Sequence, residues 1–234
     1  MSGDNGVVLP DRHLDLGCGK RPRNPYERSR LSGVDMRPLE SGEDFEYRAA
    51  DLTVEPIPYE SDRFGSVSAF DFIEHVPRVL PRGDGRSTTF PFIRLMDEIW
   101  RVLAPGGLLY AVTPAYPHAE AFQDPTHVNI ITDHTHDYFC GAKPLARMYG
   151  FGGRFEMRRL EWVAVQQAYT AHPPAPPPST ARRLAHGVRD AVRKLRGREV
   201  GGRPYLLWEL EAVKARDGDA APTSSEPADG HALG

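Results

Sequence analysis

Residues 90–114, "FPFIRLMDEIWRVLAPGGLLYAVTP", join an amphipathic helix to a strand that is apolar nearly throughout. Apolar residues recur in the first half at the helical period: Phe92, Leu95, Met96, Ile99, Trp100 and Leu103. The sequence Pro105-Gly106-Gly107 is expected to end this helix. The strand that follows is apolar on both faces, as strands buried in parallel sheets are. A helix that leads directly into such a strand favours an α/β layered fold.

Six further segments have the composition of strands: 13–16, 31–35, 45–50, 66–70, 154–165 and 203–214. A second helix is predicted from Thr132 to Met148. We therefore expect a mostly parallel sheet of about seven strands with helices on both faces. Only about a dozen residues, Pro22 and Pro25 among them, link Gly19 to the second strand, too few for a full crossover helix. The next link is equally short, so the first crossovers are expected to be shortened.

The second half of the chain carries an interruption. Residues 172–180, "HPPAPPPST", form a proline-rich linker, and 181–198 form a basic amphipathic helix. We expect one domain from residues 1–171 and 200–216, with 172–199 as an insertion and 217–234 as a disordered tail. The basic helix is expected either to pack on the domain's own sheet or to contact an anionic membrane surface or a lipid-linked carrier.

Charge and cysteine content limit the partners and the compartment. The net charge is −3, so no basic field favours nucleic acid as a partner. No apolar run is long enough to span a bilayer, and no signal peptide is recognised. Cys18 and Cys140 have no metal or disulfide spacing. We expect a cytoplasmic protein.

The stretch "LDLGCGKRP", residues 14–22, predicts a strand that ends in a glycine turn. The third glycine of a dinucleotide site is absent, and no G-K-[ST] follows as in a P-loop. Asp15 lies just before Gly17, and its carboxylate would repel a pyrophosphate but attract an ammonium group. The turn therefore suits a ligand that carries an ammonium group and an adenosine.

Three more acids, Asp35, Asp51 and Asp71, follow the next predicted strands. Open α/β sheets bind ligands at the carboxyl ends of their strands. A carboxylate after the second strand can accept hydrogen bonds from ribose hydroxyls. Asp51 and Leu52 after the third strand offer an acceptor and an apolar wall to an adenine. Each acid alone would be an ordinary turn residue, whereas the series behind a glycine turn favours a nucleoside pocket.

The motifs "LDLGCG", "GVDM", "AADL", "FDFIEHV" and "EIWRVLAPGGLLYAVTP" resemble, in order, those of class I S-adenosylmethionine-dependent methyltransferases of the type-11 group. The resemblance covers about residues 12–160 and implies a Rossmann-like fold with S-adenosylmethionine as cofactor. The cofactor residues that it implies are Asp15, Gly17, Gly19, Asp35, Met36, Asp51, Leu52, Phe70 and Asp71. More narrowly, "GCGKRPRNPY" and "TPAYPHAEAFQDPTHVNIIT" are similar to bacterial methyltransferases associated with surface-polysaccharide and natural-product genes.

Residues 114–139, where the acceptor enters such a site, contain His118, His127, His134 and His136. Methylation of a hydroxyl requires removal of its proton, and histidine is the usual base near neutral pH. His118 and His127 are the leading base candidates and His75 is the third. Asp124 would orient an imidazole or bind a sugar hydroxyl. His134 and His136 are expected to be exposed at a helix start.

Other chemistries have less support. A divalent metal held by Asp124, His127 and a neighbour would also activate a hydroxyl, but no tight ligand motif supports it, so no metal site is predicted. The motifs of adenine, amide and cytosine-C5 methylation are absent. The sequence thus predicts an O-methyltransferase that acts on a small molecule, sugar or glycan. The alternatives are N- or C-methylation of a metabolite, or a non-catalytic cofactor-binding or docking module. The oligomeric state is left open.

Overall fold

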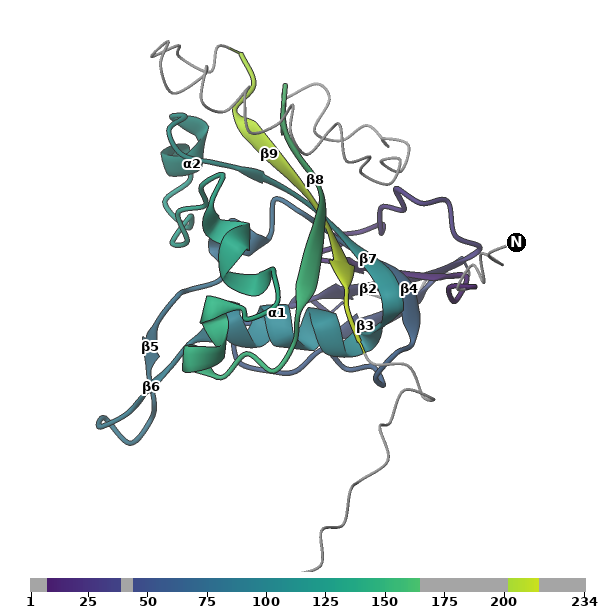
Figure 1. The fold of residues 1–234 in the computed structure, drawn as a ribbon, viewed down its shortest axis with the longest axis horizontal. Coiled ribbons are helices and arrows are strands. Elements are labelled where there is room, and N and C mark those ends of the chain that lie inside the picture. Colours follow the sequence, from purple (N-terminus) through teal and green to yellow (C-terminus); the bar gives the residue numbers. More distant parts are fainter. Residues whose placement is uncertain (1–7, 39–43, 165–201, 215–234) are drawn as a thin grey trace, which may run out of the picture.

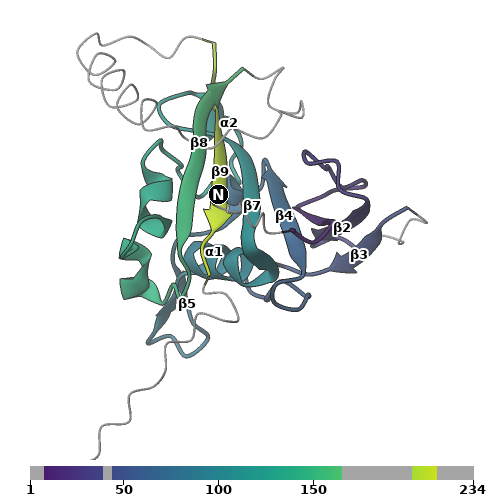
Figure 2. The same ribbon diagram turned by 45° about the vertical axis from the view of Figure 1, so that its right-hand side comes forward.

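The computed structural model describes residues 8–38, 44–164 and 202–214. They contain a seven-stranded sheet in the order β3-β2-β1-β4-β7-β9-β8, with β3 and β8 at its edges (Figures 1 and 2). The strands are β1 (Arg12–Leu16), β2 (Arg30–Asp35), β3 (Glu46–Ala49), β4 (Phe64–Phe70), β7 (Leu103–Pro114), β8 (Phe155–Val163) and β9 (Tyr205–Ala212). Pairing is parallel from β3 to β7, while β9 runs antiparallel to β7 and β8. The predicted α/β fold with a mostly parallel sheet is confirmed.

Helix α1 (Pro91–Val102) is the predicted amphipathic helix. It buries Phe92, Leu95, Met96 and Ile99 in the same core cluster as Leu14, Leu16 and Val67 of the sheet. The helix ends earlier than predicted, because β7 already begins at Leu103 and runs through the Pro-Gly-Gly sequence. A proline at 105 inside the helix would clash with the carbonyl group four residues before it, so the helix stops short of it.

The shortened first crossover is confirmed. Residues 17–29 are fully described and contain turns but no helix. This coil covers the sheet on the face opposite α1, where Tyr26 packs edge-on against Tyr110 of β7, with ring centroids 6.0 Å apart. In the described residues, helix therefore covers one face near β4, and coil covers the other. Within the second crossover, residues 39–43 lie outside the described part.

The predicted helix from Thr132 to Met148 is wrong. Two separate 3-10 turns stand in its place, η2 (Thr135–Phe139) and η3 (Leu145–Tyr149). Gly141 between them adopts a φ of +85°, and Pro144 lacks the N–H that a continuous helix needs. These two residues interrupt the segment, so it cannot form one continuous helix.

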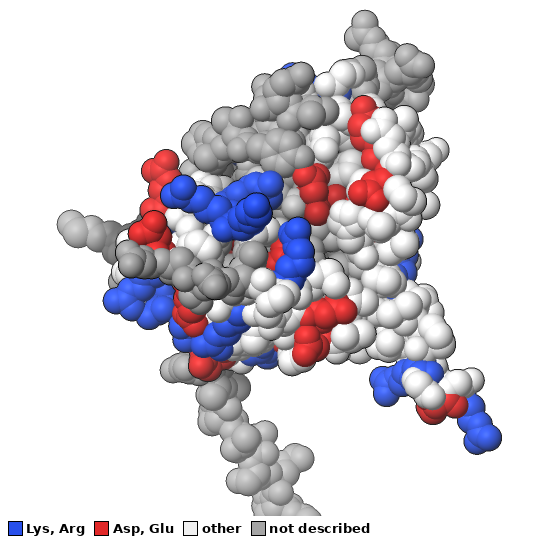
Figure 3. Space-filling model, turned by 180° about the vertical axis from the view of Figure 1, so that it is seen from behind, with Lys and Arg blue, Asp and Glu red and all other residues white. Residues whose placement is uncertain are grey.

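The remaining described elements are short. A 3-10 turn η1 (Ile73–His75) follows β4, and α2 (Glu120–Gln123) follows β7. The hairpin β5 (Leu80–Pro81) and β6 (Thr88–Thr89) projects from the body (Figure 1). Seen from behind, acidic and basic side chains lie interspersed over the surface (Figure 3).

Two sequence predictions fall on the rest of the chain. The predicted insertion at 172–199 and the predicted tail at 217–234 lie outside the described residues. Within the described ranges, no helix has the length and apolar character to cross a bilayer.

Candidate functional site

The glycine turn follows β1 and has left-handed backbone at both glycines, with φ of +63° at Gly17 and +58° at Gly19. A Cβ atom at Gly17 would lie 2.6 Å from the Phe72 ring, so Phe72 packs directly on the turn. A Cβ atom at Gly19 would meet only Arg37, at 3.9 Å. The turn therefore needs glycine for its backbone, and its Gly19 side is open to a ligand.

Asp35 lies at the carboxyl end of β2, beside this turn. Its oxygens accept hydrogen bonds from the Gly19 N–H (2.9 Å) and from the backbone and guanidinium of Arg37 (3.0–3.1 Å). Burial raises the pKa of Asp35, but the hydrogen bonds from Arg37 outweigh it and hold the pKa below its ordinary value. Arg37 is 70% exposed, so it can swing into solvent and leave these oxygens to the hydroxyls of a ribose. Met36, also predicted here, is exposed.

Asp15, which precedes the turn, is completely buried. Ser68 Oγ donates to its Oδ1 (2.6 Å), and the Arg23 N–H donates to its Oδ2 (2.8 Å). Burial raises the pKa of Asp15 to about 7, although both hydrogen bonds favour the ionised form. Both carboxyl oxygens of Asp15 thus have hydrogen-bond partners inside the protein, and these bonds hold the glycine turn in place. A direct contact of Asp15 with a cofactor stays a prediction.

The bond from Ser68 belongs to a longer network. Because the Ser68 hydroxyl donates its hydrogen to Asp15, its oxygen accepts a hydrogen bond from Nε2 of His13 (2.8 Å). Nδ1 of His13 then accepts from Ser66 Oγ (2.8 Å), which in turn accepts from Arg28 Nε (3.1 Å). Burial lowers the pKa of His13 to about 3, which keeps the ring neutral. Arg28, Ser66, His13, Ser68 and Asp15 form what we call the His13 network, in which each donor meets an acceptor.

The other predicted cofactor residues also lie near the carboxyl ends of the parallel strands. Asp51 accepts from the Thr53 N–H (2.9 Å), as a turn residue does, and Leu52 behind it is buried. Phe70 is buried in the cluster with Tyr110 on the face opposite α1, so it belongs to the core. Asp71 adopts a φ of +47°, an uncommon conformation for a non-glycine residue that is frequent at functional sites.

A second buried carboxylate, Glu74, lies in η1 directly after β4 and is only 1% exposed. Its Oε2 accepts from Thr113 Oγ1 of β7 (2.9 Å). Its Oε1 has no hydrogen-bond partner in the part of the chain that the structure describes, and it lies 4.0 Å from Nε2 of His127. Burial raises the pKa of Glu74 to about 8. The backbone carbonyl of Glu74 accepts from the N–H groups of Val128 and Asn129, which ties η1 to the loop that carries His127.

Three of the four predicted catalytic residues gather around Glu74. The rings of His75 and His127 meet edge-to-face, with centroids 4.8 Å apart. His127 Nε2 lies 4.0 Å from Asp124 Oδ2, and Thr126 Oγ1 bridges His75 Nδ1 (2.9 Å) and Asp124 Oδ1 (2.6 Å). Burial, followed by the neighbouring His127, lowers the pKa of His75. We call Glu74, His75, Asp124 and His127 the Glu74 cluster.

The other three histidines of residues 114–139 lie outside this cluster. The ring of His118 packs against Trp162 of β8, with centroids 5.3 Å apart. His134 is exposed as expected and hydrogen-bonds to Asp137 (2.9 Å). The expectation that His136 is exposed is wrong: it is buried and packs against Trp208, because the 3-10 turn aims it at the sheet.

Sequence reasoning missed Glu74 and His13. Glu74 stands beside His75 in "FDFIEHVP", but a glutamate in a turn is ordinarily solvated, and only the fold buries it. His13 and Asp15 alternate with Leu14 and Leu16 in a strand that is buried on both faces. Polar residues at alternate positions of a buried strand were the signal that could have identified the His13 network.

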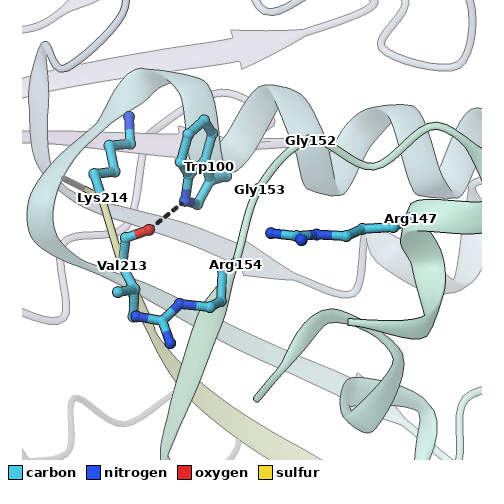
Figure 4. Close-up of a pocket in the computed structure, with 7 residues that line it drawn as sticks. All are labelled: Trp100, Arg147, Gly152, Gly153, Arg154, Val213 and Lys214. Atoms are coloured by element: carbon cyan, nitrogen blue, oxygen red, sulfur yellow. Dashed lines mark hydrogen bonds between the residues drawn. The ribbon is translucent and has the colours of Figure 1, made fainter. Parts of the chain in front are cut away.

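A hollow of about 370 Å³ lies at the amino-terminal ends of the parallel strands (Figure 4). It is lined by Trp100, Arg147, Gly152, Gly153, Arg154, Val213 and Lys214. Trp100 precedes the start of β7, and Val213 follows the end of the antiparallel β9. This hollow is thus separate from the glycine turn and the Glu74 cluster, which lie at the carboxyl ends of the parallel strands.

No family model and no curated protein matches this chain. A chain from the complex between the Haloferax volcanii Trm112 methyltransferase activator and a methyltransferase is 15% identical. That match covers 89% of this chain and 85% of the other, with a TM-score of 0.50. The [4+2]-cyclase SpnF is 17% identical over 89% of this chain and 78% of its own, also with a TM-score of 0.50. These likenesses show a shared Rossmann-like fold, and the cyclase illustrates that such a fold does not decide the reaction.

Proposed function

We propose that this protein is a class I S-adenosylmethionine-dependent methyltransferase that methylates a hydroxyl oxygen of a small molecule, sugar or glycan. The observation that carries the proposal is the position of two sites at one edge of the sheet. The glycine turn and Asp35 lie at the ends of β1 and β2, and the Glu74 cluster lies at the ends of β4 and β7. This edge is where open α/β sheets bind ligands.

The residues at the turn fit the cofactor in charge and in shape. The left-handed turn is open at Gly19, and Asp35 presents acceptor oxygens that an exposed arginine covers. Asp51 and Asp71 add negative charge at the same edge, which suits a ligand with a sulfonium and an ammonium group. When bound, S-adenosylmethionine supplies an electrophilic methyl group. Asp35 would bind the ribose hydroxyls and Leu52 would contact the adenine.

The Glu74 cluster has the groups needed to deprotonate an acceptor. Nδ1 of His127 lies 3.3 Å from the Ala121 carbonyl oxygen, which can only accept a hydrogen bond. Nδ1 therefore carries the proton in the neutral ring, and Nε2 carries the lone pair. We assign His127 as the base that takes the hydroxyl proton at Nε2, which leaves the oxygen an electron pair for attack on the methyl carbon. In its ionised form, which the pKa of about 8 favours at higher pH, the Glu74 carboxylate 4.0 Å away would stabilise the imidazolium that forms.

Methyl transfer and its product test this proposal. The full chain would be incubated with methyl-labelled S-adenosylmethionine and a panel of acceptors, sugars first, beside His127→Asn. His134→Asn is the matched control, since His134 is exposed in the same segment. We expect an O-methyl product and a loss of ~10²–10⁴-fold in His127→Asn. An N- or C-methyl product with little loss would favour the alternative methyltransferases, and no transfer to any acceptor would favour a non-catalytic module.

Contact with a membrane or lipid carrier through residues 181–198 is a separate proposal, supported by the seven basic residues between Thr180 and Arg198. Sedimentation with anionic liposomes would compare the full chain with a deletion of residues 172–200. We expect the full chain alone to sediment. Equal behaviour of both proteins would contradict docking.

A further inference from the structure

Three acceptor atoms converge in the Glu74 cluster. Candidate ligand atoms of Glu74, His75 and His127 all lie within 4.8 Å of one another. Glu74 contributes Oε1, a buried oxygen without a hydrogen-bond partner among the described residues. Leaving such an atom unpaired in the interior is costly, so its environment points to a missing positive partner.

The two histidines are held so that each presents a lone pair. Nδ1 of His127 donates to the Ala121 carbonyl (3.3 Å), which leaves Nε2 as an acceptor. The Thr126 hydroxyl donates to Asp124 (2.6 Å), so its oxygen accepts from Nδ1 of His75 (2.9 Å). Nε2 of the neutral His75 ring therefore carries a lone pair. Metal-bound histidines characteristically donate their other ring nitrogen to a carbonyl or carboxylate-linked group in this way.

A bound cation satisfies all three acceptors at once. We propose that Glu74, His75 and His127 bind a divalent transition-metal ion, with Zn²⁺ as the best chemical match. Two imidazole nitrogens and one carboxylate oxygen are ligands that Zn²⁺ prefers, and three protein ligands leave a fourth position open. Thr113 holds the other oxygen of Glu74 (2.9 Å), so Glu74 binds through Oε1 alone.

Binding requires a small contraction of the cluster. Bonds of ~2.1 Å to a tetrahedral ion bring ligand atoms to roughly 3.4 Å from one another, against 4.0 Å between Glu74 Oε1 and His127 Nε2. His127 lies on the loop between α2 and η2, and His75 is the last residue of η1, so short movements of loop residues suffice. The nearby Asp124, with Oδ2 4.0 Å from His127 Nε2, adds negative charge that favours a cation.

The catalytic consequence of this site rests on the proposed function, but the binding itself does not. The ion takes the Nε2 lone pair that His127 needs as a base, so the two roles exclude each other. In the ion-bound protein an acceptor hydroxyl at the open position has a lowered pKa and releases its proton to water. In the ion-free protein His127 takes that proton instead.

Metal titration of the chelator-treated full chain tests the site. Co²⁺ and Zn²⁺ would be added to the wild type, Glu74→Gln, His127→Asn and the control His134→Asn, with thermal unfolding to verify that each variant folds. We expect a single Co²⁺ per chain with the visible spectrum of a four-coordinate site in the wild type and control, displaced by Zn²⁺. Affinity should fall at least ~100-fold in the other two variants. Absent binding, or equal binding by all four proteins, would overturn the site.

Binding of S-adenosylhomocysteine to the same samples separates the two proposals. If the protein binds S-adenosylhomocysteine and transfers methyl groups but binds no metal, the metal site is overturned and the proposed function stands. If the protein binds metal through Glu74 and His127 but does not bind S-adenosylhomocysteine, the metal site is supported and the proposed methyltransferase function is not.

Discussion

Asp15 and Glu74 are two buried carboxyl groups near the carboxyl ends of the parallel strands β1 and β4, yet their hydrogen-bond partners differ. Asp15 receives a hydrogen bond on each oxygen and ends the His13 network, which runs back to Arg28. Glu74 receives one on Oε2, while its Oε1 faces two histidines that carry lone pairs.

This difference separates structural from reactive polar groups. A buried network whose donors and acceptors are all matched makes one arrangement rigid, and here it fixes the glycine turn. A cluster of acceptors without a donor leaves binding capacity for a proton, a cation or a substrate hydroxyl. We therefore propose that the His13 network serves stability and that the Glu74 cluster serves the chemistry.

The largest expected effect comes from Glu74→Gln. The amide keeps the hydrogen bond to Thr113 but removes the ionisable carboxyl group beside His127. We expect methyl transfer to fall by ~10²-fold or more, while the free energy of unfolding stays within ~1 kcal/mol. Labelled-methyl transfer and urea denaturation measure the two quantities. A loss of stability with unchanged activity would reverse the assignment of Glu74.

Ser68→Ala should have the opposite profile. It removes the donor to Asp15 and the acceptor for His13, so both buried groups lose a partner. The expected cost is ~2–4 kcal/mol in the free energy of unfolding, with activity kept at temperatures where the variant is folded. Urea denaturation would compare it with Ser61→Ala on an exposed turn, for which we expect less than ~0.5 kcal/mol. Equal stabilities would mean that the network contributes little.

The protonation of Asp15 gives a smaller, pH-dependent effect. The unfolded chain releases this proton near the ordinary pKa of 3.8, whereas the folded protein keeps it up to about pH 7. The folded state therefore binds more protons in this window, and the contribution of Asp15 to stability falls as the pH rises. Unfolding of the wild type and Asp15→Asn at several pH values should show the variant gaining relative stability from pH ~4 to ~7. A variant that loses stability relative to the wild type over this range, or that shows no change, would contradict a raised pKa of the buried Asp15.

The smallest effect is expected for Arg37→Ala. The exposed guanidinium pairs with Asp35, and such solvent-exposed pairs contribute little to stability. Since Arg37 covers the oxygens assigned to the ribose, its removal should leave the affinity for S-adenosylhomocysteine unchanged or a few-fold higher. Calorimetry measures this affinity. A large loss would show that Arg37 itself binds the cofactor.

The fold was predictable because its determinants are local. The helical period around Leu95 and Ile99, and the short, proline-containing link after Gly19, predict α1 and the shortened crossover directly. The helix predicted over Thr132–Met148 is wrong because Gly141 and Pro144 divide the segment into two 3-10 turns. Helical periodicity does not reveal where the backbone must turn.

The candidate site was only partly predictable. His75, Asp124 and His127 are predicted as catalytic residues from their type, and the fold brings these three side chains together. Glu74 depends on burial by β7 and the His127 loop, which are far from it in sequence. A single sequence cannot reveal that an acid will lose its solvent, and this loss of solvent distinguishes Glu74 from the other turn acids.

Calorimetric titration of S-adenosylhomocysteine into the full chain, beside Asp35→Ala, tests the proposed cofactor site directly. Asp35 has the acceptor oxygens assigned to the ribose at the end of β2. We expect micromolar binding by the wild type that Asp35→Ala abolishes, with both proteins folded. No binding by the folded wild type, or equal binding by both proteins, would contradict the assignment of this strand edge as the cofactor site.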